Sequence, residues 1–411
     1  MNAIINNQEA IDCIQAPEGR PLEVIEADFR SDTRWLDFVS SHPGALVYHH
    51  SGWLAALEDE YDRPCIAFAC VDPDGVFQGV LPLLPTEGLP IFFNKHPVGK
   101  RLSSLPRTPL AGPLALNEHA AEALVRAALT RVCNEPGMQL ELKTTIAGLD
   151  QLIPELACIR WRDTYVRDLG SQGKSLQVAG GADVSNGGSC GLHNDCSTLR
   201  FGNAHNNHRV KWAVSKAVRH GLHVRLADTE RDLNAWYLLY LDGMRRNAVP
   251  ARPYRFFASL WNSLGRSGVM KLILVEQATA KGVRLVSGSV LLSFDSGVFW
   301  AFTGTRENDL PLHPNDLTIW HCLQESYGEG YRWFDLGEVA EDHPELAQFK
   351  AKWGTVKKPI YRYYYPMDPN DLSTAQRRGA SNLSRRVTRA AWQMLPLKST
   401  ALVSDWIYRY L

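Results

Sequence analysis

The chain has 411 residues, which is long for one ordinary domain and suits two domains of about 150–200 residues each. Hydrophobic residues make up 45% and charged residues 21%, the composition of a globular protein. The formal net charge is zero, which excludes a general nucleic-acid binder, so we expect no DNA partner.

The sequence also predicts a cytoplasmic location. Its first twenty residues lack the basic start and apolar core of a signal peptide, and no run of about 18 apolar residues predicts a membrane-spanning helix. Eight scattered cysteines without a signal peptide indicate reduced thiols. We therefore expect a cytoplasmic protein that can lie at the inner face of the membrane.

The first half of the chain mixes helical and strand-like patterns. Asp72–Gly75 is a turn between two apolar runs and predicts a hairpin, and the Pro- and Gly-rich stretch 85–113 predicts a long surface connection. Apolar periodicity predicts helices at 34–39, 51–61 and 118–132, and strands at 65–71, 76–84, 139–143 and 161–169.

A Gly- and Ser-rich break follows at 170–198, where we expect a flexible insertion between the halves. It contains Cys190, His193 and Cys196, and His205 and His208 come shortly after. These residue types can bind zinc, but their spacing matches no standard zinc finger. We therefore expect a disordered tether and no metal.

The second half begins with helices and continues with strands. Turns at Lys281–Gly282 and Asp295–Gly297 separate three apolar runs, which predicts a meander. The expected helices are 209–220, 233–244 and 254–264, and the expected strands are 224–226, 269–275, 283–294 and 298–303.

Residues 317–366 predict a helix, a strand at 331–336, a second helix that opens at Pro344, and a last strand at 360–365. In the second helix an apolar stripe is expected to comprise Leu346, Phe349 and Trp353. Lys350 lies on its edge, whereas Lys352 is expected to be an ordinary solvated lysine. Lys350 can either extend its amine to water or hold a fixed charge where negative charge develops in a reaction.

Three motifs in this half resemble those of the FemAB-like branch of the GNAT acyltransferase superfamily, in particular its exopolysaccharide-associated members. They are the Phe-Asp-Leu-Gly at 334–337 with the Phe-Lys-x-x-Trp-Gly at 349–354, the arginine-rich segment 244–257, and the Trp-Gln-Met-Leu-Pro-Leu at 392–397. The resemblance extends from about Arg34 to the C-terminus and is strongest after Arg200.

The element order and the resemblance together predict an α+β (mixed α/β) fold of two tandem GNAT-like modules. We expect an N-terminal module at 20–170, the Gly/Ser-rich insertion at 171–198, a C-terminal module with the motifs at 199–368, and a basic amphipathic tail at 369–411.

The resemblance implies that Lys350 stabilises the tetrahedral oxyanion formed when an amine or hydroxyl attacks an acyl group. Asp335, at the end of a strand, can orient or deprotonate that nucleophile, or it can simply cap the turn to Gly337. No evident Ser-His-Asp or Cys-His set is present, so we expect no covalent acyl-enzyme.

Further residues are candidates for substrate binding. Basic side chains can form an anion site or remain solvated, and the aromatic ones can equally belong to the core. The candidates are Arg209, Lys211, Arg245, Arg246, Arg252, Tyr254, Asn315 and Trp353.

The sequence does not decide which molecule donates the acyl group. GNAT enzymes that use acetyl-CoA carry a glycine-rich loop for the pyrophosphate, and the matching stretch 304–315 has only one glycine. An acyl-CoA donor is expected, with aminoacyl-tRNA as the other possibility, because some FemAB-like proteins use it.

The tail 381–411 combines arginines with aromatic residues, so it can contact an anionic membrane or dock on its own chain. We favour a peripheral membrane contact, where a lipid-linked acceptor would be found.

The expected function is therefore N- or O-acyl or aminoacyl transfer to a small-molecule or lipid-linked acceptor, a cell-envelope or polysaccharide precursor. The alternative is a non-catalytic GNAT-fold binding or scaffold protein of a polysaccharide biosynthesis system.

Overall fold

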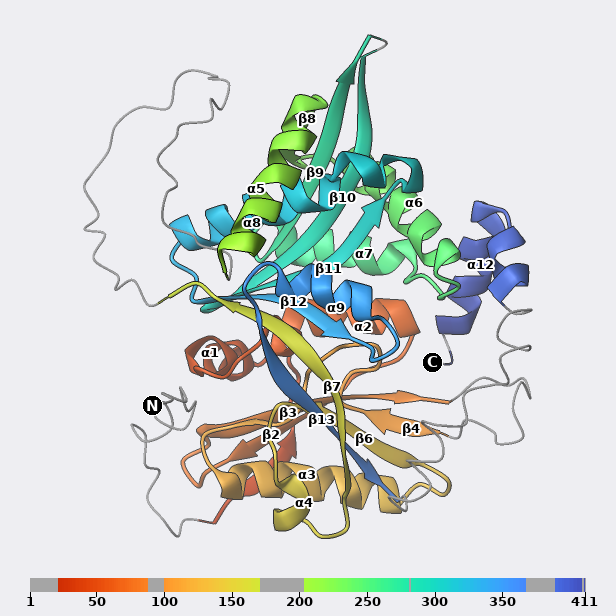
Figure 1. The fold of residues 1–411 in the computed structure, drawn as a ribbon. Coiled ribbons are helices and arrows are strands. Elements are labelled where there is room, and N and C mark those ends of the chain that lie inside the picture. The colour runs from red at the N-terminus through yellow and green to blue at the C-terminus, as the bar shows by residue number, and fades with distance from the viewer. Residues whose placement is uncertain are drawn as a thin grey trace.

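The computed structural model of the protein describes residues 21–87, 100–170, 203–280, 282–366, 389–408 and 410. Thirteen strands form one twisted sheet that runs through both halves of the chain (Figure 1). The strand order is β1-β2-β3-β4-β6-β13-β7-β12-β11-β10-β9-β8, and β5 pairs with β3.

The first half contributes one end of the sheet and the helices that cover it. Most predicted elements are present, and α2 has the predicted bounds. The elements are β1 (Glu23–Glu26), α1 (Thr33–Ser41), the short 3₁₀ helix η2 (Val47–His49), α2 (Ser51–Tyr61), β2 (Ile66–Val71), β3 (Phe77–Thr86), β4 (Arg101–Ser103), β5 (Leu114–Ala115), α3 (Glu118–Cys133), β6 (Gln139–Thr144), α4 (Leu149–Leu152) and β7 (Ala157–Asp168).

The second half contributes the other end. The helix predicted at 254–264 is α7 followed by one π-helical turn, η3. The elements are α5 (Ala204–Arg219), β8 (Leu222–Leu226), α6 (Glu230–Arg246), α7 (Tyr254–Leu260), η3 (Trp261–Gly265), β9 (Met270–Thr279), β10 (Gly282–Phe294), β11 (Gly297–Thr305), η4 (Glu307–Leu312), α8 (Pro314–Gly328), β12 (Trp333–Val339), α9 (Pro344–Ala351), β13 (Val356–Tyr365) and α12 (Leu397–Tyr408).

The two halves are joined through their last strands. β13, which lies inside the predicted second module, inserts into the first half's sheet between β6 and β7. β7, the last strand of the first half, pairs in turn with β12. The domain boundaries stay a prediction, but this exchange means that the two halves share one continuous sheet.

Helices cover both faces of the second half's sheet, and β10 is therefore buried on both sides. Val290 and Leu292 face α6 and α7 in a core that also includes α1 and α2. Leu291 and Val286 face α5 and α8. A third core lies under α3 in the first half. The core between α1, α2, α6 and α7 contains residues from both halves, so it holds the two halves together.

Candidate active site

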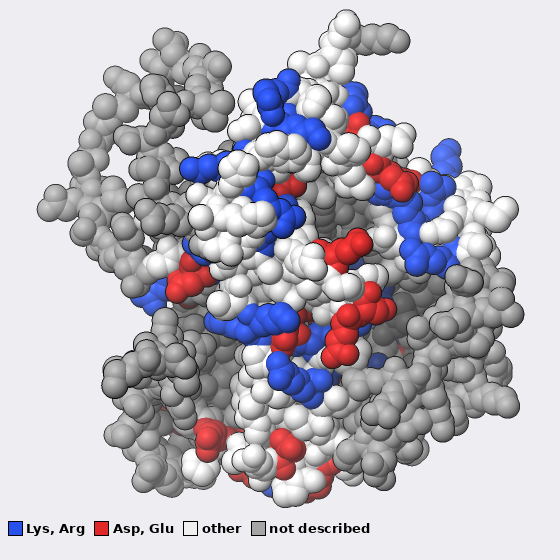
Figure 2. Space-filling view, viewed as in Figure 1, with Lys and Arg blue, Asp and Glu red and all other residues white. Residues whose placement is uncertain are grey.

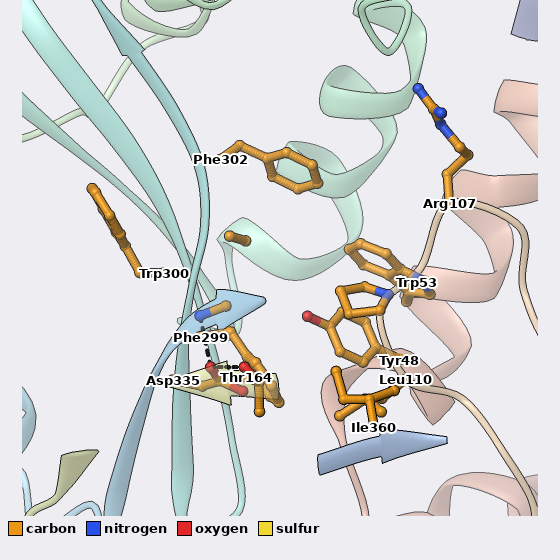
Figure 3. A pocket seen from close by; sticks show the side chains of 13 residues that line it. Tyr48, Trp53, Arg107, Leu110, Thr164, Phe299, Trp300, Phe302, Asp335 and Ile360 are labelled. Carbon is orange, nitrogen blue, oxygen red and sulfur yellow. Dashed lines mark hydrogen bonds between the residues drawn. The ribbon is translucent and has the colours of Figure 1, made fainter. Parts of the chain in front are cut away.

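The strands β11 and β12 run parallel for only three residue pairs. The last pair is Phe299 with Asp335, after which β11 continues to Thr305 and β12 to Val339 without pairing each other. A cavity of about 190 Å³ lies at this separation (Figure 3). Its walls come from both halves of the chain and are mainly apolar and aromatic. The lining residues are Tyr48, Trp53, Arg107, Pro109, Leu110, Thr164, Phe299, Trp300, Ala301, Phe302, Asp335, Gly337 and Ile360.

A bulge in β11 faces this cavity. Val290 pairs with Phe302 and Leu291 pairs with Trp300, so Ala301 is the extra residue of the bulged strand. A bulge leaves backbone groups outside the ladder and bends the strand. The bulge therefore helps β11 to separate from β12.

Asp335 is the only carboxylate among the residues that line the cavity, and it is almost fully buried. Its Oδ1 accepts the Thr164 hydroxyl at 2.5 Å and the Gly337 N–H at 2.6 Å. Its Oδ2 has no hydrogen bond to any residue that the structure describes. Burial raises the pKa of Asp335, and the bonds from Thr164 and Gly337 oppose that rise. One oxygen thus fixes the side chain, and the other can accept a proton or a hydrogen bond from a ligand.

Tyr48, in η2 of the first half, faces this carboxylate across the cavity. Its ring packs on Phe299 with centroids 5.0 Å apart, and its hydroxyl points toward Asp335 (Figure 3). Burial, and then the charge of Asp335, raises the pKa of Tyr48, so the phenol stays protonated. Within the described chain its hydroxyl makes no hydrogen bond, so it can donate one to a molecule in the cavity.

Lys350 is the only described buried residue of α9. Its Nζ donates to the carbonyl oxygens of Gly337 at 3.0 Å and Glu338 at 3.1 Å. Burial lowers the pKa of Lys350 to about 8, with Asp335 and Glu338 acting in the opposite direction. The amine therefore does not extend to water; it lies directly behind Gly337, which lines the cavity.

The expected apolar stripe of α9 is only partly present. Leu346 is 41% exposed, whereas Trp353, just after the helix, is fully buried. Lys352 is not a solvated lysine either, because its Nζ pairs with Asp316 and lies 4.1 Å from the centroid of the Phe349 ring. Helix α9 is thus rotated so that Lys350 faces β12.

The start of α8 is occupied by side chains of the chain itself. Asp316, in its first turn, is paired with Lys352. Asn315 Oδ1 accepts the hydroxyls of Ser287 at 3.2 Å and Thr305 at 2.8 Å, which ties α8 to β10 and β11. A buried carboxylate therefore already lies at the positive end of this helix dipole.

Three of the predicted binding arginines have partners inside the protein. Arg245 donates to Asp242 and to the Leu395 carbonyl of the tail, and Arg246 donates to the Thr305 carbonyl. Arg252 is buried, pairs with Glu60 and donates to the Arg107 carbonyl at 2.7 Å. These arginines join the halves and the tail.

The remaining candidates lie apart from the cavity. Arg209 and Lys211 are exposed on α5, which covers the face of the sheet opposite α6, so they do not meet the three arginines. Lysine and arginine side chains gather over α5 in Figure 2. Tyr254 packs on Tyr237, with ring centroids 5.3 Å apart, and Trp353 belongs to the core.

Sequence reasoning missed the first half's share of the site, namely Tyr48, Trp53 and Arg107. No motif marks these residues. They lie about 230 to 290 positions before Asp335 in the chain, so only the tertiary fold brings them to it. Thr164 was missed for the same reason.

The comparisons with known proteins agree with this geometry. Residues 203–350 match a GNAT acetyltransferase domain. The match covers the strands that open the cavity and ends on Lys350, but it spans well under half of the chain. No curated protein matches the sequence.

Solved structures extend the similarity over both halves. A crystal structure of FemX covers 86% of this chain and 99% of its own, with a TM-score of 0.57 and 15% identity. L-PGS from Bacillus licheniformis covers 89% and 97%, with a TM-score of 0.51 and 12% identity. The C-terminal domain of an Agrobacterium fabrum protein described as a lysylphosphatidylglycerol synthetase covers 84% and 93%, with a TM-score of 0.52 and 12% identity. At such identities these structures show the fold, and the predicted mixed α/β fold of GNAT type is confirmed.

Among the described residues, no group of three or more His, Cys, Asp or Glu side chains could hold a metal ion. Cys190, His193 and Cys196 lie outside those residues, and His205 and His208 are on α5. In the same part of the chain, no helix is long and apolar enough to cross a bilayer.

Proposed function

We propose that this chain is an acyltransferase that passes an acyl or aminoacyl group to an amine or hydroxyl by direct attack. The observation that carries the proposal is the divided role of Asp335, with Oδ1 held by two donors and Oδ2 left for a ligand, at the separation of β11 and β12. The GNAT acetyltransferase match over 203–350 includes this separation.

In the proposed reaction, the amine or hydroxyl of the acceptor attacks the acyl carbon of a thioester or ester donor. The new C–N or C–O bond forms as Asp335 Oδ2 takes the proton of the nucleophile. The tetrahedral intermediate then collapses, the bond to the donor's sulfur or oxygen breaks, and that proton passes to the leaving thiol or hydroxyl. Burial favours the protonated carboxyl, which makes Asp335 a better proton acceptor than a solvated aspartate.

Two further groups would stabilise the negative charge of the intermediate. The Tyr48 hydroxyl can donate to it from the opposite wall. Lys350 places its positive charge behind Gly337, 3.6 Å from where a Cβ on that glycine would lie. Its ammonium acts through the strand backbone, because it bonds to two carbonyls there. Both groups are preorganised, which is the condition for such stabilisation.

For the donor, we propose an acyl-CoA, with aminoacyl-tRNA as the alternative. The GNAT match supports the first. The second is supported by the carboxylate already present at the start of α8, where GNAT enzymes that use acetyl-CoA bind the pyrophosphate. It is also supported by α5, which has four Lys or Arg residues that could meet a nucleic acid and no Asp or Glu. None of these four cations is in an ion pair with a described residue.

For the acceptor, we propose a cell-envelope or polysaccharide precursor, small or lipid-linked, reached at the membrane surface. The described part of the tail docks on α6 and α7, yet α12 exposes Leu402 and Trp406 on its outer side. These exposed apolar side chains, in a tail whose sequence also carries Arg385, Arg386 and Arg389, support a peripheral membrane contact.

The test is a transfer assay with a panel of acyl-CoA and aminoacyl-tRNA donors against amine and hydroxyl acceptors, with Asp335→Asn as the control. Thermal unfolding with acetyl-CoA, longer acyl-CoAs and free CoA selects the donor, because a ligand that binds only the native state raises the midpoint. If no pair reacts, or if Asp335→Asn reacts as fast as the wild type, the proposal fails.

A further inference from the structure

The loop that follows β4 forms part of the cavity wall in a strained backbone conformation. Leu105 has φ +58° and Arg107 has φ +56°, and neither is a glycine. Side chains with a Cβ rarely adopt this left-handed region. Arg107, Pro109 and Leu110 of the same loop line the cavity. Strain of this kind persists only where the surrounding structure enforces it.

Three contacts from outside the loop enforce it. Lys143, on β6, donates from Nζ to the Leu105 carbonyl at 3.2 Å. Arg252, from the second half, donates to the Arg107 carbonyl at 2.7 Å. The third contact comes from the C-terminal helix, where the Tyr408 hydroxyl accepts from both Nε and Nη2 of Arg107, at 3.2 and 3.1 Å.

Tyr408 belongs to the core, whereas its partner Arg107 is an exposed residue of the loop. Tyr408 is 2% exposed, and the Arg107 guanidinium also lies 5.2 Å from the centroid of its ring. Helix α12 is held in place by Asp405, which pairs with Arg255, and by Ser404, whose hydroxyl accepts the Ala251 N–H at 3.1 Å. In Figure 3 the guanidinium of Arg107 points away from the aromatic walls, in keeping with its bond to α12.

We propose that the C-terminal helix is part of the active site, with Tyr408 as a positioning residue that holds Arg107 and so fixes the strained 104–110 loop as a wall of the cavity. The tail thus does more than close the core, because the shape of the substrate cavity depends on one of its hydroxyl groups. This inference rests on the proposed function for its kinetic consequence, but its structural part can be tested without any substrate.

The experiment compares Tyr408→Phe with Tyr410→Phe in the full-length chain. Tyr408→Phe keeps the ring and removes only the oxygen that Arg107 binds. Tyr410 lies two residues further along, and its hydroxyl has no hydrogen bond to a described residue, so it is a matched control. Amide hydrogen exchange is followed by mass spectrometry on the peptide that spans 104–112.

Loss of a hydrogen bond to a charged group should raise exchange in this peptide about tenfold in Tyr408→Phe and leave it unchanged in Tyr410→Phe. With a donor and acceptor identified, Tyr408→Phe should raise KM about fivefold and change kcat little, because the wall shapes the binding site.

Equal exchange of 104–112 in the two variants would overturn the inference, even if Tyr408→Phe lowers the thermal midpoint, since that is all a purely structural tyrosine would do. Faster exchange with unchanged KM would also overturn it, because the loop would then not shape the site. If no transfer activity is found at all, the proposed function fails, and the exchange result still decides whether Tyr408 fixes the loop.

Discussion

The two halves of the sheet place a carboxylate at corresponding positions. Glu141 is the last residue of the three-pair parallel ladder between β4 and β6, as Asp335 is between β11 and β12. Their surroundings differ. Glu141 binds Arg101 and Arg362, each at 3.0 Å. Among the described residues, Asp335 binds only Thr164 and the Gly337 N–H, and it has a cavity in front of it.

The residue two positions later shows the same difference. In β6 it is Lys143, whose buried amine fills the space beside the strand; in β12 it is Gly337, which leaves room for Lys350 behind it and for the cavity in front. One half has thus filled its position with salt bridges, and the other has kept it open. We therefore place the chemistry in the second half.

The largest expected effect is on activity. Asp335→Asn should lower kcat/KM of acyl transfer by about 10²–10⁴, the usual worth of a general base. Glu141→Gln should change kcat/KM by no more than about twofold, since Glu141 does not line the cavity at Asp335. Steady-state kinetics on both variants measures this, and equal losses in the two would refute the comparison.

Stability should respond in the opposite order. Glu141→Gln leaves Arg101, Arg362 and Lys143 without their carboxylate, which should cost about 3 kcal/mol in the free energy of unfolding. Asp335→Asn should be neutral or stabilising at pH 7, because burial raises the pKa of Asp335 and the folded state therefore disfavours its charge. Urea unfolding of both variants measures these differences.

The stability contributed by Glu141 should also depend on pH. Burial alone would raise the pKa of Glu141, but Lys143, Arg101 and Arg362 hold it at about 2. The ionised carboxylate therefore stabilises the fold above its usual pKa of 4.5, and this contribution is lost as the pH falls toward about 2. Urea unfolding between pH 5 and pH 2 should show a smaller decline in Glu141→Gln than in the wild type.

Activity should decline above pH 8 if the charge of Lys350 matters. Its pKa of about 8 means that the ammonium is lost as the pH rises through that value. Lys350→Met should lower kcat/KM by about 10–100-fold at pH 7 and abolish the decline.

The comparison variant is Lys143→Met in the first half, which removes the other buried amine and with it the bond to the Leu105 carbonyl of the cavity-wall loop. Burial also lowers the pKa of Lys143 to about 8, so this variant should keep the alkaline decline if the decline belongs to Lys350. The decline would not belong to Lys350 if it disappeared in Lys143→Met, or if the pH profile of Lys350→Met were the same as that of the wild type.

The smallest effect is expected at Gly337. Its φ of +83° is left-handed, so Gly337→Ala should cost about 1 kcal/mol in stability. The added methyl would also lie 3.6 Å from Lys350 Nζ, and kcat/KM should fall a few-fold. Gly137→Ala is the control, because its φ is +77° and nothing lies within 4 Å of the added methyl. Equal kinetics in the two variants would remove Gly337 and Lys350 from the site.

Local pattern was enough for most elements. The turn at Asp72–Gly75 separates β2 from β3 as predicted, and Pro344 opens α9 at its first position, where its missing N–H costs no hydrogen bond. These features depend on neighbours within a few residues. The orientation of α9 did not follow, because spacings of three and four residues fit more than one face of a short helix, and only contact with β12 selects the face of Lys350.

The sequence by itself therefore determined the order of helices and strands, the fold class, and the two residues, Asp335 and Lys350, that mark β12 and α9 as functional candidates. The tertiary structure alone decided that β13 crosses into the other half, that Arg245, Arg246 and Arg252 bind internal partners, and that Tyr48 faces Asp335. The physical reason is range: turns and helix caps are set by adjacent residues, whereas the cavity forms where segments far apart in the chain meet after the whole sheet is assembled.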